Sequence, residues 1–67
     1  MTIEVNGQEM TVPDQIKTVE ALLEHLELEM RIVVVEQNRR VLERDDHKHA
    51  SLQEGDRLEI VQFVGGG

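Results

Sequence analysis

The sequence predicts an α+β fold of two layers, in which one main helix packs on one face of a mixed sheet of four to five strands. Three observations support this prediction. The length of 67 residues suits a single small domain. The first residues alternate between apolar and polar side chains, which is typical of a hairpin. One segment with the apolar spacing of a helix follows, and after it come short runs of β-branched residues. Phe63 is the single aromatic residue, so aliphatic side chains must fill the core.

The first element is a β-hairpin. Residues 2–5 and 8–12 alternate between apolar and polar side chains, and Asn6-Gly7 separates the two runs. An Asn-Gly pair favours a two-residue turn because both central residues of a type I′ turn have positive φ. Such a turn places Ile3 opposite Met10, so that the apolar side chains of both strands share one face.

The second element is an amphipathic helix. Apolar residues recur at steps of three and four positions, at Ile16, Val19, Leu22, Leu23 and Leu26. Thr18 is the expected N-cap, because its hydroxyl can accept an unpaired backbone N–H, and Glu20 suits the positive end of the helix dipole. Two or three helical turns are marginal alone in water, so the apolar stripe is expected to pack on the sheet.

The next segments predict two strands and a loop. The run Ile32–Val35 is apolar at both odd and even positions, which favours an interior strand covered on both faces. Residues 37–40 are expected to form a polar turn, and Val41–Leu42 a short strand. Residues 43–50 are typical of a charged surface loop.

The last strand is expected over Arg57–Phe63, after a turn at Glu54-Gly55-Asp56. If Leu58 and Ile60 face the helix, alternation directs Val61 and Phe63 to the open face of the sheet.

Candidate catalytic groups are few. The chain has no cysteine, which excludes a disulfide, a thiolate nucleophile and a Cys-ligated metal. His47 and His49 follow two aspartates, and alternation would direct both imidazoles to one side, yet nothing nearby supplies the hydrogen bonds that orient metal ligands. Ser51 and Thr18 have no activating base. We therefore expect neither a metal site nor an enzyme.

The chain is acidic, with 7 Lys and Arg against 14 Asp and Glu, a net charge of −7. This charge argues against nucleic acid and anionic membranes as partners and is compatible with basic protein surfaces. Residues 1–10 lack the features of a signal peptide, and no apolar run approaches the roughly 20 residues needed to span a bilayer. A cytoplasmic location is expected.

The final residues carry the main functional hypothesis. We expect a domain over residues 1–64 and a flexible tail over Gly65–Gly67. Three extended residues reach roughly 10 Å, and glycines are thin enough to enter a narrow channel of a partner. The reactive group of such a tail is the α-carboxylate of Gly67, which needs activation by another protein. A frayed end is the alternative. Val61, Phe63 and Val64 form the expected docking patch beside the tail, although ordinary strand packing also accounts for Val61.

Several features together resemble one family: the Asn6-Gly7 hairpin, Thr18-Val19 before Leu22-Leu23, the Val-rich run before Asn38, the Glu54-Gly55-Asp56 turn and the ending Phe63-Val64-Gly65-Gly66-Gly67. The chain is similar to the ThiS family, the sulfur carrier proteins of thiamine thiazole biosynthesis. The resemblance implies a ubiquitin-like β-grasp fold, with the first and last strands parallel in the middle of the sheet. His47 is a departure, because many relatives carry Trp or Tyr there.

The resemblance also implies a mechanism. An adenylating enzyme (ThiF) uses ATP and Mg²⁺ to convert the Gly67 carboxylate into an acyl adenylate. Sulfur from a cysteine-derived donor then displaces AMP, and the resulting thiocarboxylate supplies sulfur to thiazole synthase (ThiG). Gly65 and Gly66 thread the partner's channel, and the chain itself binds no cofactor. The alternatives are a carrier resembling the small subunit of molybdopterin synthase, a modifier conjugated to lysines, and a non-covalent ubiquitin-like binding module.

Overall fold

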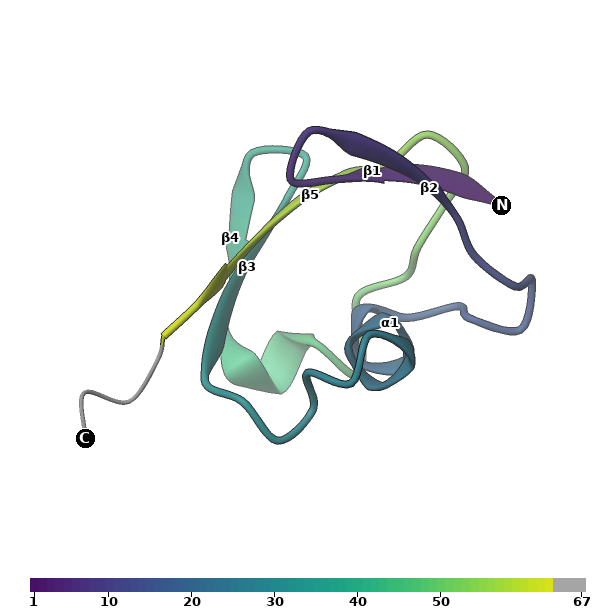
Figure 1. Cartoon of the computed structure of the whole chain (residues 1–67). Helices are drawn as coiled ribbons and strands as arrows, with labels where there is room; N and C mark the ends of the chain where they lie inside the picture. The colour runs from purple at the N-terminus through teal and green to yellow at the C-terminus, as the bar shows by residue number, and fades with distance from the viewer. Residues whose placement is uncertain (64–67) are drawn as a thin grey trace.

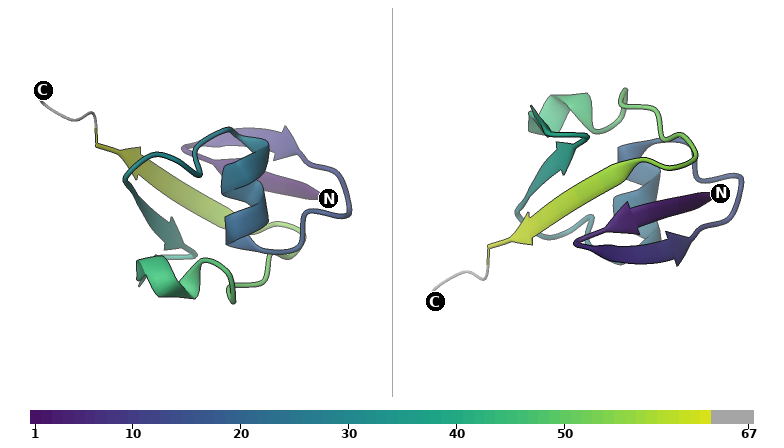
Figure 2. Two further views of the ribbon diagram at one scale, coloured as in Figure 1. Left: turned by 90° about the horizontal axis from the view of Figure 1, so that it is seen from below. Right: turned by 90° about the horizontal axis from the view of Figure 1, so that it is seen from above.

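The computed structural model describes residues 1–63, which form five strands, one α-helix and one short 3₁₀ helix. In chain order these are β1 (Thr2–Val5), β2 (Gln8–Thr11), α1 (Val19–His25), β3 (Val33–Gln37), β4 (Arg40–Leu42), η1 (Arg44–Asp46) and β5 (Arg57–Gln62). The strands form one sheet in the order β2-β1-β5-β3-β4. β1 and β5 are parallel and the other neighbours are antiparallel. The predicted mixed sheet, with the first and last strands parallel and side by side, is confirmed, and β3 lies on the other side of β5 (Figures 1 and 2).

The amino-terminal hairpin forms as predicted. Asn6 and Gly7 both have positive φ, at 51° and 81°, and they join β1 to β2 in a two-residue turn. Ile3 pairs with Met10, as expected from the turn length. Ile3 is buried in the core, so the register directs the apolar face of the hairpin toward the layer of the helix.

The helix covers one face of the sheet. It begins after Thr18, whose Oγ1 accepts a hydrogen bond from the backbone N of Ala21 at 3.1 Å. α1 is only seven residues long, so its stability depends on packing rather than on its own propensity. Figure 1 shows α1 below the concave side of the sheet. The core lies between these two layers and consists of Ile3, Val5, Val12, Val19, Leu22, Leu23, Val35, Leu42, Leu52, Leu58 and Ile60.

The prediction that Ile32–Val35 is covered on both faces is wrong. β3 does lie inside the sheet, between β5 and β4. However, the single helix covers only one face, so Val35 is fully buried whereas Val34 is 38% exposed and Ile32 is 73% exposed. A fully apolar run is typical of a strand with helices on both sides, and this domain has one layer of helix over residues 1–63.

The turn between β3 and β4 is shorter than predicted. β3 continues through Gln37 and β4 begins at Arg40, so the turn consists of Asn38 and Arg39 alone. Their φ angles of 49° and 71° correspond to the same turn class as Asn6-Gly7. The sequence offers no glycine at this point, which is why the second tight hairpin was not predicted. β5 is also one residue shorter than expected and ends at Gln62.

Candidate functional site

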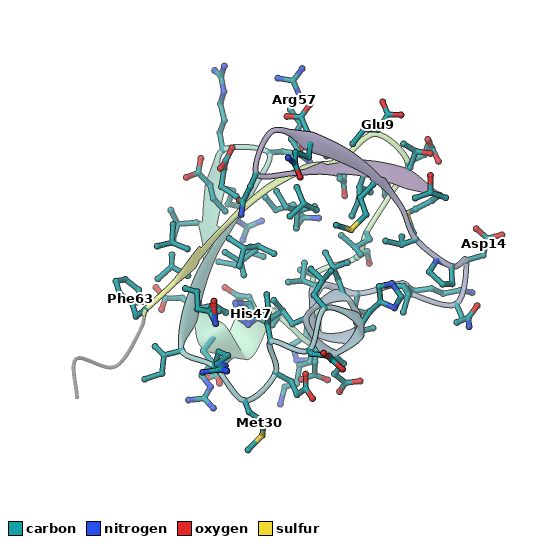
Figure 3. The ribbon with its side chains drawn as sticks, in the orientation of Figure 1. Glu9, Asp14, Met30, His47, Arg57 and Phe63 are labelled. Atoms are coloured by element: carbon teal, nitrogen blue, oxygen red, sulfur yellow. The ribbon has the colours of Figure 1, made fainter. Side chains whose placement is uncertain are left out.

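The carboxyl end of β5 is the feature that the sequence singles out, and β5 is the central strand of the sheet. Leu58 and Ile60 point into the core and are 1% and 8% exposed. Val61 and Phe63 are 54% and 55% exposed. The predicted alternation is therefore confirmed, and Figure 3 shows Phe63 at the end of β5 on the side of the sheet opposite the helix.

The exposed side chains of β5 belong to a larger apolar surface on the open face of the sheet. Val34 of β3 pairs directly with Val61, and the backbone N of Phe63 donates a hydrogen bond to the carbonyl of Ile32 at 3.0 Å. Paired residues of neighbouring strands present their side chains on the same face. We call this surface the outer apolar patch; its members are Ile32, Val34, Val41, Val61 and Phe63, each at least 38% exposed.

Sequence reasoning missed three members of this patch. Ile32 and Val34 were assigned to a strand buried on both faces, and Val41 was not singled out. The signal that could have found them is the single predicted helix, because one helix of two or three turns can cover only one face of a sheet. The position of Val41 on this face follows from its pairing with Glu36, which the β3–β4 register fixes.

The other half of the open face is charged. A shallow hollow of about 480 Å³ lies there, lined by Glu4, Glu36, Asn38, Arg39, Arg57 and Glu59. The Nε atom of Arg57 lies 4.0 Å from Oε2 of Glu4, and both side chains are exposed. An exposed ion pair of this kind contributes little to stability. The face therefore combines an apolar area near the end of β5 with a charged area near its start.

The histidines are not arranged as a metal site in the part of the chain that the structure describes. Within residues 1–63, no group of three or more His, Asp or Glu side chains is arranged to hold a metal ion. His47 and His49 do not face the same side. His47 is buried at 7% exposure and lines hollows beside Leu23, whereas His49 is exposed and lines a separate hollow beside Leu42.

The interpretation of residues 43–50 as a surface loop is therefore wrong for His47. The segment includes η1, and the carbonyl of His47 accepts a hydrogen bond from the backbone N of Glu20 at 2.9 Å. The carbonyl of Ala50 likewise accepts from Val19. Because the first N–H groups of a helix lack partners within the helix, these carbonyls tie the segment to α1. Figure 3 shows His47 beside η1.

The buried imidazole leads to a stability prediction. Nε2 of His47 is buried and has no hydrogen-bond partner among the residues described. An unsatisfied buried polar group costs about 1–3 kcal/mol. His47→Leu is therefore expected to raise the free energy of unfolding by about 1 kcal/mol in urea titrations. The exposed His49→Leu is the control, with a change within about 0.5 kcal/mol. A lower free energy of unfolding for His47→Leu would contradict this reasoning.

The remaining predicted site residues, Val64, Gly65, Gly66 and Gly67, lie outside the described residues. The division into a domain over 1–64 and a tail over 65–67 stays a prediction. What the structure establishes is the position and the exposed outer face of the strand that leads to them.

Comparison with known proteins decides the family. A family model described as the ThiS family matches residues 2–67. The chain belongs to the ThiS family. The resemblance inferred from the sequence is thus confirmed, and a sulfur carrier protein ThiS of Bacillus subtilis is 34% identical over 65 residues, which cover 97% of this chain and 98% of the relative.

Solved structures of the same family agree with the fold. The crystal structure of a thiamine biosynthesis protein (ThiS) from Geobacter metallireducens superposes with a TM-score of 0.82 at 36% identity, and each chain is covered completely. A solution NMR structure of a thiamine biosynthesis protein from the same organism gives a TM-score of 0.81, with 88% of that chain covered. The β-grasp prediction is confirmed.

A second curated relative is a longer protein. A thiazole synthase of Paramagnetospirillum magneticum is 39% identical over 67 residues. The match covers the whole of this chain but only 20% of the length of that protein. A ThiS-family segment therefore occurs inside a chain named thiazole synthase.

No helix within residues 1–63 of the present chain is long and apolar enough to cross a membrane.

Proposed function

We propose that the chain acts through the carboxylate of Gly67, which partner enzymes convert to a thiocarboxylate. Membership of the ThiS family makes the chain a sulfur carrier of thiamine biosynthesis. The proposal concerns how the sulfur is carried. In this scheme the chain is a protein co-substrate rather than an enzyme, and its cargo is bound covalently at the end of the chain.

The observation that carries the proposal is the position of β5, the strand that the glycines follow in the sequence. β5 lies in the middle of the sheet and reaches Phe63 with its outer face exposed, and three glycines follow one residue later. Glycines have no Cβ atoms, so an extended Gly65–Gly67 segment is thin enough for a narrow channel and can adopt conformations that other residues resist. The sequence thus combines a well-anchored strand with a slender reactive end.

The chemistry divides between the chain and its partners. One carboxylate oxygen of Gly67 attacks the α-phosphate of ATP, pyrophosphate leaves, and an acyl adenylate forms. Hydrosulfide released by a cysteine-derived sulfur donor then attacks the acyl carbon: a C–S bond forms, the C–O bond to the phosphate breaks, AMP leaves, and Gly67 ends in a thiocarboxylate. The adenylating partner (ThiF) binds ATP and Mg²⁺, and this chain supplies the acyl group. Because the reaction consumes ATP, we place it in the cytoplasm.

Thiazole synthase (ThiG) is the proposed acceptor of the sulfur. The Paramagnetospirillum magneticum thiazole synthase supports this assignment, because a segment similar to this entire chain forms part of it. Joining a carrier and an acceptor in one chain raises the effective concentration of each for the other, which benefits two proteins that act on the same group.

We propose that the outer apolar patch, together with Val64, docks on the adenylating enzyme. The patch is continuous with the segment that must enter that enzyme, because Phe63 lies at the end of β5. Apolar side chains supply contact area near the tail, and the net charge of −7 steers the approach of a basic partner surface. This assigns a binding role to Val61 and Phe63 and extends it to Val34.

Truncation of Phe63 tests the docking patch. Phe63→Ala is expected to raise the KM for the carrier in ATP–pyrophosphate exchange about tenfold, the effect of losing an aromatic contact in an interface core. The control is Thr11→Ala, which removes an exposed side chain of the edge strand β2, opposite Thr2 at the start of β1. Equal KM values for both variants would contradict the docking role.

Mass spectrometry tests the proposed function itself. The purified chain is incubated with a ThiF-type enzyme, ATP, Mg²⁺ and a sulfur donor, and a parallel sample lacks ATP. We expect the exchange of one oxygen for sulfur at Gly67, only when ATP is present. An unchanged mass would favour a non-covalent binding module, and attachment to larger proteins would favour a conjugated modifier. Either outcome would overturn the proposal.

A further inference from the structure

The two tight hairpin turns share a feature that their sequences do not show. Each turn has an asparagine at its first positive-φ position, Asn6 at 51° and Asn38 at 49°. The side chains of both asparagines reach past their own hairpins and hydrogen-bond to the backbone of β5. The central strand is therefore held from its two sides by the tips of two different hairpins.

Asn6 holds β5 close to its carboxyl end. Oδ1 of Asn6 accepts a hydrogen bond from the backbone N of Ile60 at 2.7 Å, and Nδ2 donates to the carbonyl of the same residue at 3.2 Å. The backbone N of Asn6 also donates to the carbonyl of Leu58 at 2.9 Å. The amide side chain of Asn6 thus hydrogen-bonds to the backbone of Ile60 in the place where the backbone of β1 would do so if β1 were longer.

These contacts matter because β5 is paired unequally on its two sides. β3 pairs with β5 from Leu58 to Gln62, whereas β1 pairs only with Arg57 and Leu58. The backbone groups of Gln62 face the β1 side by alternation, and among residues 1–63 they have no hydrogen-bond partner. On that side, Asn6 is the last described contact before the chain continues toward the glycines.

We infer that Asn6 is a positioning residue, which holds the final part of β5 in the direction that the adenylating partner must engage. The inference rests on the function proposed above and adds a residue that neither the tail nor the outer apolar patch includes. A strand hydrogen-bonded along one edge only twists and frays more easily than one held along both. Without the Asn6 side chain, the end of β5 in the free carrier is expected to adopt more orientations. Binding must then order this segment, and the entropic cost of that ordering weakens the affinity for the partner.

The expected kinetic signature follows from this step. Once the chain is bound, the partner itself holds the tail, so the rate of the bound complex is unchanged. The Asn6→Gly variant keeps the positive φ that the turn needs and removes both side-chain hydrogen bonds. We expect KM for the carrier in ATP–pyrophosphate exchange to rise about three- to tenfold with kcat unchanged, the size of effect that one or two net hydrogen bonds exert on an equilibrium.

Asn38→Gly is the matched control. It alters the same position of the same turn class and also removes two side-chain hydrogen bonds, from the backbone N of Arg57 at 2.9 Å and to Oδ1 of Asp56 at 3.1 Å. These contacts lie at the start of β5, far along the strand from the tail. Asn38→Gly is expected to lower the free energy of unfolding about as much as Asn6→Gly does. The KM for the carrier is expected to stay within about twofold of wild type, because Asn38 lies outside the proposed interface.

Amide hydrogen exchange gives a second readout. Exchange at the backbone N–H of Ile60 is expected to accelerate in Asn6→Gly and to stay near its wild-type rate in Asn38→Gly. Equal KM values for the two variants, with an active wild type, would overturn the inference alone. A wild-type chain that is not adenylated would overturn the proposed function and the inference with it.

Discussion

Adenylation is expected to fall by roughly a hundredfold or more when Gly66 is replaced by Trp, because a displacement of about 1 Å at a reacting centre can cost that much. The indole would have to enter the channel that the proposed glycine strip threads, or hold the Gly67 carboxylate away from ATP. The domain itself should fold normally, because Gly66 follows the last strand. ATP–pyrophosphate exchange measures the loss.

The control for this result is Thr11→Trp. Thr11 is exposed on the edge strand β2, opposite Thr2 at the start of β1, so the same large side chain there should leave adenylation unchanged. Far-ultraviolet circular dichroism and the urea midpoint of both variants should match the wild type. Retention of adenylation by Gly66→Trp would contradict threading while leaving the family assignment intact.

The second large effect concerns stability. Leu58→Ala is expected to lower the free energy of unfolding by about 2–5 kcal/mol, because Leu58 is 1% exposed between the sheet and α1 and its truncation leaves a cavity. Folded domains have a total stability of about 5–15 kcal/mol, and a domain this small lies near the lower end. The variant should therefore be substantially unfolded at physiological temperature, which urea titration monitored by circular dichroism will measure.

Val61→Ala supplies the comparison on the same strand. Val61 is 54% exposed on the open face, so its truncation should change the free energy of unfolding by no more than about 0.5 kcal/mol. The contrast separates the two faces of β5, one that stabilises the fold and one available for binding. A similar loss of stability in both variants would show that the open face contributes to the core.

Local patterns allowed most of the elements to be predicted. The Asn6-Gly7 turn determines the register of the first hairpin, and the spacing of Val19, Leu22 and Leu23 identifies the buried face of α1. Each of these signals consists of residues that lie within a few positions of one another in the sequence. The strand order came from the family resemblance, because pairing between β1 and β5 joins residues more than 50 positions apart.

The failures have a common physical origin. Whether a side chain on β3 is buried depends on how many layers cover the sheet, so Val34 could not be placed from the run Ile32–Val35 alone. His47 lies among charged residues in the sequence, yet the attachment of its segment to the start of α1 buries its ring. The hydrogen bonds between the Asn6 side chain and Ile60 could not be predicted either, because the two residues lie 54 positions apart in the sequence.

The central position of β5 has a consequence for how the protein is made. Translation produces this strand after the other four, yet β1 and β3 lie on either side of it and do not pair with each other. A nascent chain therefore cannot complete its sheet until β5 has been synthesised. Products that terminate before β5 would lack the middle of the fold and be open to proteolysis. Degradation of such products would leave mainly chains whose sheet is closed around β5.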